Sequence, residues 1–516
     1  MRTLILLFVF IFSVLFLFSN GRFGGDGLED YLTAESLVLD QDLAIHDRPF
    51  AVKEMRYQPR GEAGQKGYYS PHGIGMPMLL VPFYLIGLLF SGIFSQLPRD
   101  YLTQFFCSLA NPFFISMTAV ALFKFVEDSG LTRKTSFYTT LVYCFSTMTL
   151  IYGRSGFSEP ALAFFILLAF YYLFLYEKQG KGRHLVFFSC CVGSSILIKD
   201  VSFLYLPLFF LYVFTKCVRV RSKQAGLYRI KLLSQALIPL ATFVFFYFFV
   251  HALAASNVSA SPTGRLDLLV KYGFVLGLQP WKGLYYFLLS PGKGFFVYNP
   301  VLLCGLFGVA YGVKRLKIVS WGMLGFMLFT LLYYGSKFTR GSLFSWGPRY
   351  LYTVIPLFSI FLAFFMENIR TMGKRLIVFG FSVIGFFIQL PALVIGSTQF
   401  IFFVKEKLGL SEYLINFMPE LSPIKGSWAL LSSAITNSLT GRSLTFVYKP
   451  DVWFIQPVEQ SMVGYDSWDI WWVHAVALNA SLKPLVWVAC GGLAVIAMAC
   501  VAQLMLHGNT RAPAQR

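Results

Sequence analysis

Apolar stretches long enough to cross a membrane recur along most of the chain. A spanning helix needs about 20 mostly apolar residues, and runs near this length are separated by short polar connections. Lys and Arg gather in alternate connections, as is typical of cytoplasmic loops. Placing all of these clusters inside predicts about 12 spans with both termini in the cytoplasm. The clusters are Arg133-Lys134, residues 178–183, 216–231, 314–317 and 370–375, and the C-terminal Arg511 and Arg516.

Residues 73–94 do not fit this alternation. They are apolar and long enough to cross, but counting them as a span would put Arg133-Lys134 outside and invert every later basic loop. The segment also contains Pro77, Pro82 and four glycines. We therefore predict a bent interfacial or re-entrant helix on the non-cytoplasmic side, with an ordinary span as the alternative.

Composition places the chain in the membrane. It is 56% hydrophobic and only 13% charged, against about 25% charged residues in soluble domains. The net charge of +19 then indicates contact with anionic lipid headgroups rather than with nucleic acid. The prediction is an all-α polytopic membrane protein. Residues 1–396 form the core, with an outer loop at 19–101; residues 397–484 form a small outer loop domain; residues 485–516 form the last helix and a cytoplasmic tail.

Three acids begin the first outer loop, in Asp26-Gly27-Leu28-Glu29-Asp30. The residues after them have helical periodicity, with apolar positions that could face the membrane surface. Acids at a helix N-terminus are favoured by the helix dipole, so they can be solvated structural residues. The functional alternative is a carboxylate that takes a proton from an acceptor hydroxyl.

Further charged residues flank spans on the same outer side. Arg154 and Glu159 lie in the link Arg154-Ser155-Gly156-Phe157-Ser158-Glu159, and Lys199 follows the next pair of spans. Such groups either anchor the helix ends at the interface or line a cavity in the bundle.

Two motifs could bind an anion. Ser290-Pro291-Gly292-Lys293-Gly294 can expose backbone N–H groups and an ammonium, although it lacks the spacing of a nucleotide P-loop. Trp346-Gly347-Pro348-Arg349-Tyr350 offers a guanidinium fork suited to phosphate. Each could also be a basic interfacial anchor.

These segments resemble a known family, the bacterial GT-C glycosyltransferases that use a polyprenyl-phosphate-linked sugar, relatives of the protein O-mannosyltransferases and of the lipid A aminoarabinose transferase. The matching stretches cover roughly residues 20–370 in the expected order. They are GDGLEDYLTAESLVLDQDL, YSPHGIGMPMLLVPFYLIG, RSGFSEPALAFF, LYYFLLSPGKGFFVYNP and WGPRYLYTVIPL.

The resemblance implies a GT-C-like bundle with interfacial helices and a catalytic acid in the first outer loop. The family usually has an acidic pair there, whereas Gly27 follows Asp26 in this chain. Asp26 is therefore the first candidate base, with Asp30 and Glu29 as alternatives. Cations should neutralise the leaving lipid phosphate. The candidates are Lys293, Arg349, Arg154 and Lys199, with Glu159 and Tyr350 lining the cavity.

The implied reaction moves one sugar from a polyprenyl-phosphate donor to a hydroxyl of a glycolipid, polysaccharide or protein, with inversion, on the outer face of the inner membrane. No cofactor is required and no metal-ligating cluster is evident, although Glu29 or Asp30 leaves room for a divalent cation. Membrane lipids are the other expected partners, and nucleic acid is not one. The alternatives are an O-antigen-type glycan polymerase or ligase, and a lipid-linked-sugar flippase or transporter.

Overall fold

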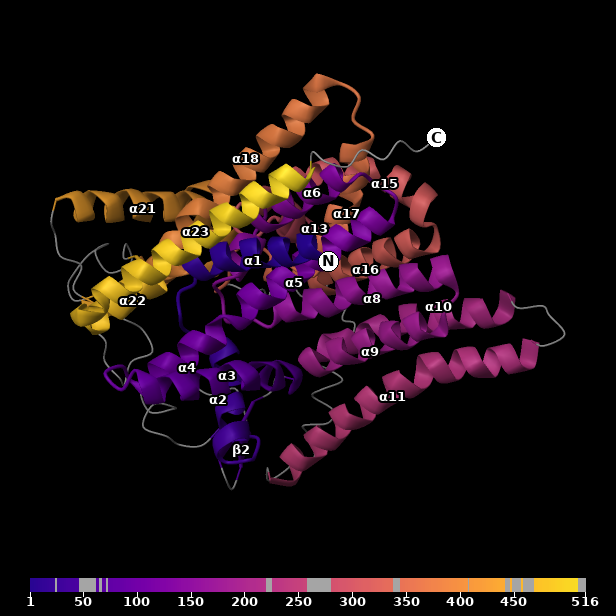
Figure 1. The fold of residues 1–516 in the computed structure, drawn as a ribbon, viewed down its shortest axis with the longest axis horizontal. Helices are drawn as coiled ribbons and strands as arrows, with labels where there is room; N and C mark the ends of the chain where they lie inside the picture. Colours follow the sequence, from indigo (N-terminus) through magenta and orange to yellow (C-terminus); the bar gives the residue numbers. More distant parts are fainter. Residues whose placement is uncertain are drawn as a thin grey trace.

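The structure is a computed structural model, and helices dominate it, as the predicted all-α membrane class requires (Figure 1). It describes residues 1–23, 26–45, 62–64, 67–70, 73–219, 225–257, 280–336, 344–406, 408–440, 446–447, 456–457 and 468–508. The predicted basic residues Arg221, Lys223, Arg511 and Arg516 lie outside these ranges.

The first half of the chain contains fifteen of the described elements. They are α1 (Arg2–Leu17), α2 (Asp26–Leu39), β1 (Ala44–Ile45), β2 (Glu62–Gly64), β3 (Gly67–Tyr69), α3 (Gly75–Ile93), α4 (Arg99–Ser108), α5 (Ala110–Asp128), α6 (Arg133–Phe145), α7 (Thr149–Tyr152), α8 (Glu159–Gln179), α9 (Gly182–Ile198), the 3-10 helix η1 (Asp200–Tyr205), α10 (Leu206–Arg219) and α11 (Ala225–Asn257). The short strands form an antiparallel sheet in the order β1-β3-β2.

The second half continues the helical pattern and adds the antiparallel pair β4–β5. Its elements are α13 (Pro280–Leu289), α14 (Phe295–Tyr298), η2 (Pro300–Leu302), α15 (Leu303–Leu316), α16 (Ile318–Ser336), η4 (Arg349–Leu351), α17 (Val354–Glu367), α18 (Met372–Ile395), α19 (Gln399–Glu406), α20 (Glu412–Phe417), η5 (Pro419–Leu421), α21 (Pro423–Leu439), β4 (Phe446–Val447), β5 (Gln456–Pro457), α22 (Trp471–Leu478), η7 (Ala480–Leu482) and α23 (Lys483–Gly508).

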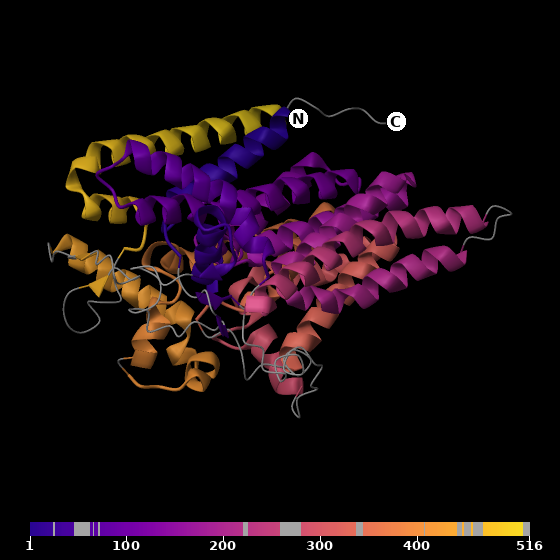
Figure 2. The ribbon, with the colours of Figure 1, turned by 90° about the horizontal axis from the view of Figure 1, so that it is seen from below.

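Polar contacts between helix ends show that the connections between helices lie at two opposite ends of the bundle. At one end of the bundle, Arg2 donates to Gln503 at 3.3 Å, so the start of α1 lies beside the end of α23, and the two helices run together in both views (Figures 1 and 2). Further contacts join the other basic connections at this end, which we call the basic face. They are Arg133–Thr3, Thr132–Glu367, Arg315–Ser129, Lys178–Asp128 and Lys216–Glu177.

The opposite end, which we call the site face, carries the predicted site residues. Twelve described helices run between the two faces, and the predicted number of about 12 membrane spans stays a prediction; the helices are α1, α5, α6, α8, α9, α10, α11, α15, α16, α17, α18 and α23. Of the described helices, 8 are long and apolar enough to cross a membrane by themselves. Shorter members such as α6 and α15 adjoin the turns α7 and η2 at the site face.

Helices α3 and α4 form a hairpin on the site face. Residues near the start of α3 lie beside the end of α4, since the Cys107 thiol donates to the Leu80 carbonyl, while Phe90 packs on Phe106 at 4.7 Å between ring centroids. By length and hydropathy α3 could cross by itself, and α4 with α5 forms a further candidate span, Arg99–Asp128, of 30 residues. The re-entrant course of residues 73–94 therefore stays a prediction.

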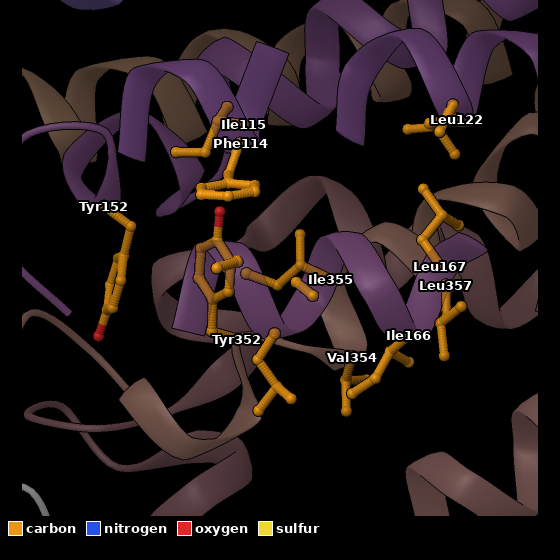
Figure 3. Packing of buried hydrophobic residues seen from close by; sticks show 14 of the residues in the cluster. Phe114, Ile115, Leu122, Tyr152, Ile166, Leu167, Tyr352, Val354, Ile355 and Leu357 are labelled. Carbon is orange, nitrogen blue, oxygen red and sulfur yellow. The ribbon is translucent and has the colours of Figure 1, made fainter. Parts of the chain in front are cut away.

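Close helix packing holds the bundle together. In a membrane, helices associate through small residues that let backbones approach. Gly308 of α15 is such a position, because a Cβ there would overlap the Phe361 carbonyl oxygen of α17. Figure 3 shows the neighbouring core, where Ile166 and Leu167 of α8 lie near Val354 and Leu357 of α17.

Helix α2 differs from the expectation of a helix lying on the membrane surface. Its residues from Gly27 to Ser36 are all buried, because α3 and the first sheet cover it. The apolar residues Leu28, Tyr31, Leu32 and Ala34 contact protein instead of the membrane surface, whereas Leu39 at the end of the helix is 41% exposed. This enclosure fixes the acids of the first outer loop in space.

Candidate active site

Arg349 joins two acids at the site face. Its Nε donates to Glu159 Oε1 at 2.7 Å, and its Nη1 donates to Asp26 Oδ2 at 2.8 Å. Lys199 also donates to Glu159 Oε1. The structure therefore brings together four of the charged residues that the sequence singled out, from positions more than 300 residues apart.

The four side chains differ in exposure. Glu159 is 2% exposed and Arg349 is 10% exposed, whereas Asp26 and Lys199 are 20% and 23% exposed. Glu159 thus forms the floor of the cluster, and Asp26 and Lys199 are its accessible members. A buried carboxylate is costly unless it is paired, and Glu159 is paired twice.

Helix ends position each of these side chains. Asp26 is the first residue of α2 and Glu159 is the first residue of α8, where the helix dipole favours an anion. Arg349 opens η4. The two acids come together because α2 touches the link before α8: a Cβ on Gly27 would overlap the carbonyl oxygen of Gly156. The glycine that departs from the family pattern is therefore required by this contact.

Aromatic rings surround the cations. The Arg349 guanidinium lies 3.8 Å from the centroid of Phe157, and Tyr350 lies within 6 Å of both Arg349 and Lys199. Tyr350 stacks on Tyr334 at 4.5 Å. The rings hold the two cations in place, and Tyr350 borders the cluster, which is the position expected of a cavity-lining residue.

Glu29 and Asp30 lie in the first turns of α2 and are 5% and 4% exposed. Ser70 donates to Glu29 Oε2 at 3.3 Å. Asp30 Oδ1 is buried without a hydrogen-bond partner among the described residues. Burial, reinforced by Asp26 and Glu29, raises the pKa of Asp30 well above its usual value. Asp30 is therefore suited to hold a proton rather than to accept one.

Lys293 is fully buried in the loop between α13 and α14. Its Nζ donates to the carbonyl oxygen of Ser345 at 2.5 Å and to its hydroxyl at 3.2 Å. Tyr152 donates to the next carbonyl, that of Trp346, at 3.1 Å. These contacts place Lys293 beneath the loop that leads to Arg349, where it supports that loop.

Arg154 belongs to a second cluster, together with Arg22, Asp469 and His474. Its Nη2 donates to Asp469 Oδ2 at 2.7 Å, and its Nη1 donates to the Ala392 carbonyl at 2.6 Å. Sequence reasoning did not identify Asp469. An acid amid tryptophans in a chain that is only 13% charged was the available signal.

Among the described residues, no group of three or more His, Cys, Asp or Glu side chains could hold a metal ion. The site has four acids, Asp26, Glu29, Asp30 and Glu159. Two of them are paired with cations: Asp26 with Arg349, and Glu159 with Arg349 and Lys199. The arrangement can therefore neutralise an anion and accept a proton with protein side chains.

Comparison with known families gives a match over part of the chain. Residues 69–256 match the family model described as dolichyl-phosphate-mannose-protein mannosyltransferase. This match, over less than half of the chain, supports the resemblance to the protein O-mannosyltransferases. The matched part includes Arg154, Glu159 and Lys199, and it begins after the acids of α2. A search of curated proteins found no match.

Three solved structures align with most of this chain. ArnT from Cupriavidus metallidurans in the apo state is 13% identical, with 96% of this chain and 74% of ArnT covered and a TM-score of 0.43. The same protein bound to undecaprenyl phosphate is 11% identical, with 97% of this chain and 77% of ArnT covered and a TM-score of 0.44. The archaeal oligosaccharyltransferase AglB from Archaeoglobus fulgidus, in complex with an inhibitory peptide and a dolichol-phosphate, is 14% identical. The alignment covers 92% of this chain and 63% of AglB, with a TM-score of 0.41.

Proposed function

We propose that this protein transfers a single sugar from a polyprenyl-phosphate-linked donor to a hydroxyl of a glycolipid, polysaccharide or protein. The observation that carries the proposal is the Arg349 bridge between Asp26 and Glu159, with Lys199 beside it. We place the reaction on the outer face of the inner membrane, because the basic face opposite the site has the charge of a cytoplasmic surface.

In this mechanism Asp26 takes the proton of the acceptor hydroxyl as the hydroxyl attacks the anomeric carbon. Asp26 suits this role because it is the most exposed of the four acids and accepts a hydrogen bond from a guanidinium, which favours its ionised form. Asp30, whose raised pKa favours the protonated form, is a poor base. One displacement inverts the anomeric centre and leaves no sugar bound covalently to the enzyme.

The departing lipid phosphate carries negative charge that must be stabilised as the glycosidic bond breaks. Arg349 and Lys199 are the cations of the central cluster and are proposed to receive it. Lys293 and Arg154 are buried in contacts with Ser345 and Asp469, so we assign them the support of the loops around the site. No metal ion is needed in this scheme.

The test is Asp26→Asn in the purified full-length protein in lipid nanodiscs. The donors are undecaprenyl phosphates carrying mannose, glucose, galactose or 4-amino-4-deoxyarabinose, offered with a membrane glycolipid extract. Release of undecaprenyl phosphate and the mass gained by an acceptor are measured. Asp26→Asn should lower kcat by about 100-fold or more, because it removes the proton acceptor while retaining its size.

Asp30→Asn is the matched control on the same helix. Because the raised pKa of Asp30 favours its protonated form, its replacement by a neutral amide should leave most of the turnover. An inactive Asp30→Asn beside an active Asp26→Asn would assign the base to Asp30. Full activity in both variants and in Glu29→Gln would refute the mechanism, and repeated additions to one glycan or transport without transfer would support a polymerase or a flippase.

A further inference from the structure

We propose that Asp469 is a positioning residue for sugar transfer, which holds in register the two connectors that carry Asp26 and Glu159. The inference rests on the proposed function, because it treats these two acids as part of the active site. Asp469 itself lies in the outer segment between β5 and α22, far along the chain from both connectors.

The Asp469 carboxylate receives one arginine on each oxygen. Arg22 donates to Oδ1 and Arg154 donates to Oδ2, both at 2.7 Å. The Asp469 backbone N–H in turn donates to the Val394 carbonyl at 2.8 Å, which ties the acid to the end of α18. The two arginines come from different connectors, so the single carboxylate cross-links them.

These connectors are the ones that lead into the central cluster. Arg22 lies four residues before Asp26, and Arg154 lies five residues before Glu159. Further along, Arg349 links Asp26 and Glu159 to each other. The same two pieces of chain are therefore joined twice, first by a carboxylate between two arginines and then by an arginine between two carboxylates.

The two links are coupled through contact between the connectors. Between them, the Phe23 ring packs on Gly156, and Gly27 of α2 touches the carbonyl of the same residue. Asn111 also donates to the Phe157 carbonyl at 2.9 Å. A shift of the link at Arg154 would therefore pass to Phe157 and to the guanidinium of Arg349 above it.

The surroundings of Asp469 favour its ionised form. Burial acts to raise the pKa of Asp469, but Arg22 and Arg154 outweigh it and hold the pKa below its usual value. His474, whose Nε2 lies 3.4 Å from Oδ1, has its pKa lowered to about 4, chiefly by burial. At neutral pH the cluster is thus one anion between two guanidiniums and a neutral imidazole.

Other contacts hold the segment in place without this charge. The Trp471 backbone N–H donates to the Ser19 carbonyl at 2.9 Å, and the indole N–H groups of Trp471 and Trp472 donate to the carbonyls of Phe16 and Leu17. Removing the charge of Asp469 should therefore loosen the connectors while the segment stays docked on α1.

The test is Asp469→Asn in the same nanodisc assay with the undecaprenyl-phosphate donors. A displacement of about 1 Å at reacting groups can lower a rate by about 100-fold, so we expect kcat to fall by roughly 10- to 100-fold with little change in donor KM. A weaker Arg349–Asp26 contact would also raise the pKa of Asp26, and the acid limb of the kcat/KM profile should move to higher pH. A loss of packing alone would not move that limb.

Asp128→Asn is the matched control, because Asp128 also receives two donors, Lys124 at 2.7 Å and Tyr171 at 2.6 Å, but at the basic face. It should keep the wild-type rate and pH profile. Should Asp469→Asn fail to accumulate, Arg22→Gln at a side chain that is 20% exposed breaks one arm of the link and should shift the same limb. A folded Asp469→Asn with wild-type kcat and pH profile would overturn the positioning role, whereas an inactive wild type would overturn the proposed function instead.

Discussion

Replacing Arg349 by Lys tests whether the bridge needs a fork or only a positive charge. The guanidinium uses two different nitrogens, Nε for Glu159 and Nη1 for Asp26. A lysine ammonium is a single point on a flexible stem, so it can reach one acid and must release the other. Glu159 keeps Lys199 as a partner, and we expect the contact with Asp26 to be the one that weakens.

The magnitude follows from the lost contact. A hydrogen bond to a charged group contributes about 1.5–3 kcal/mol, and the Asp26–Arg349 pair is shielded enough from solvent to keep most of it, since the side chains are 20% and 10% exposed. With about 1.4 kcal/mol for each factor of ten, Arg349→Lys should lower kcat about 10- to 100-fold. Arg349→Ala should lower it further, because the leaving phosphate then also loses its cation.

The assay is single-turnover release of undecaprenyl phosphate, with the thermal unfolding midpoint measured in parallel. Arg315→Lys is the control, because Arg315 donates through Nε to the Ser129 carbonyl at 3.1 Å on the basic face, and it should turn over like the wild type. If Arg349→Lys retains the wild-type rate, charge alone suffices and the fork has no part in the reaction.

Two further predictions concern the position of α2 and the topology. Gly27→Ala should lower kcat about tenfold and lower the free energy of unfolding by roughly 1–3 kcal/mol, because the new Cβ overlaps the carbonyl of Gly156. Gly92→Ala is the control: a Cβ there meets open space, so the turnover and the unfolding midpoint should stay at the wild-type values. In a cysteine-free protein, Ser95→Cys should react with an impermeant maleimide from the outside, and Lys181→Cys only after the cytoplasmic side is opened. Labelling of Ser95→Cys only after the cytoplasmic side is opened would refute the re-entrant course of residues 73–94.

The gathering of the basic connections at one face was predictable, because the basic residues cluster in alternate connections. Each basic cluster marks a helix end, and contacts such as Arg133–Thr3 and Arg315–Ser129 later join these ends at one face. The same parity predicts that residues 73–94 return without crossing, and this stays a prediction. What the pattern could not supply was the surroundings of α2: its periodicity is equally suited to a membrane surface or to a protein interior, and tertiary packing decides between them.

Residue types indicated which charges matter but not how they pair. Asp26, Glu159, Lys199 and Arg349 were all identified from the chain, yet an isolated arginine beside Tyr350 fits a phosphate site and a structural bridge equally well. Pairing depends on long-range contacts that a local motif does not encode. For this reason Arg154 was grouped with the phosphate ligands, whereas its guanidinium contacts Asp469.

Glycine at position 27 connects the two kinds of information. The resembling family usually has an acidic pair where this chain has Asp26-Gly27, so the sequence leaves Asp26, Glu29 and Asp30 as candidate bases. In the structure it is the residue that lets α2 approach the link before α8, and that approach puts Asp26 within reach of the arginine that also holds Glu159. A larger side chain at position 27 would move Asp26 away from Glu159. The small residue at position 27 is therefore needed for Asp26 to join the cluster. The absence of a Cβ at Gly27 therefore explains both the departure from the family's acidic pair and the close contact between α2 and Gly156.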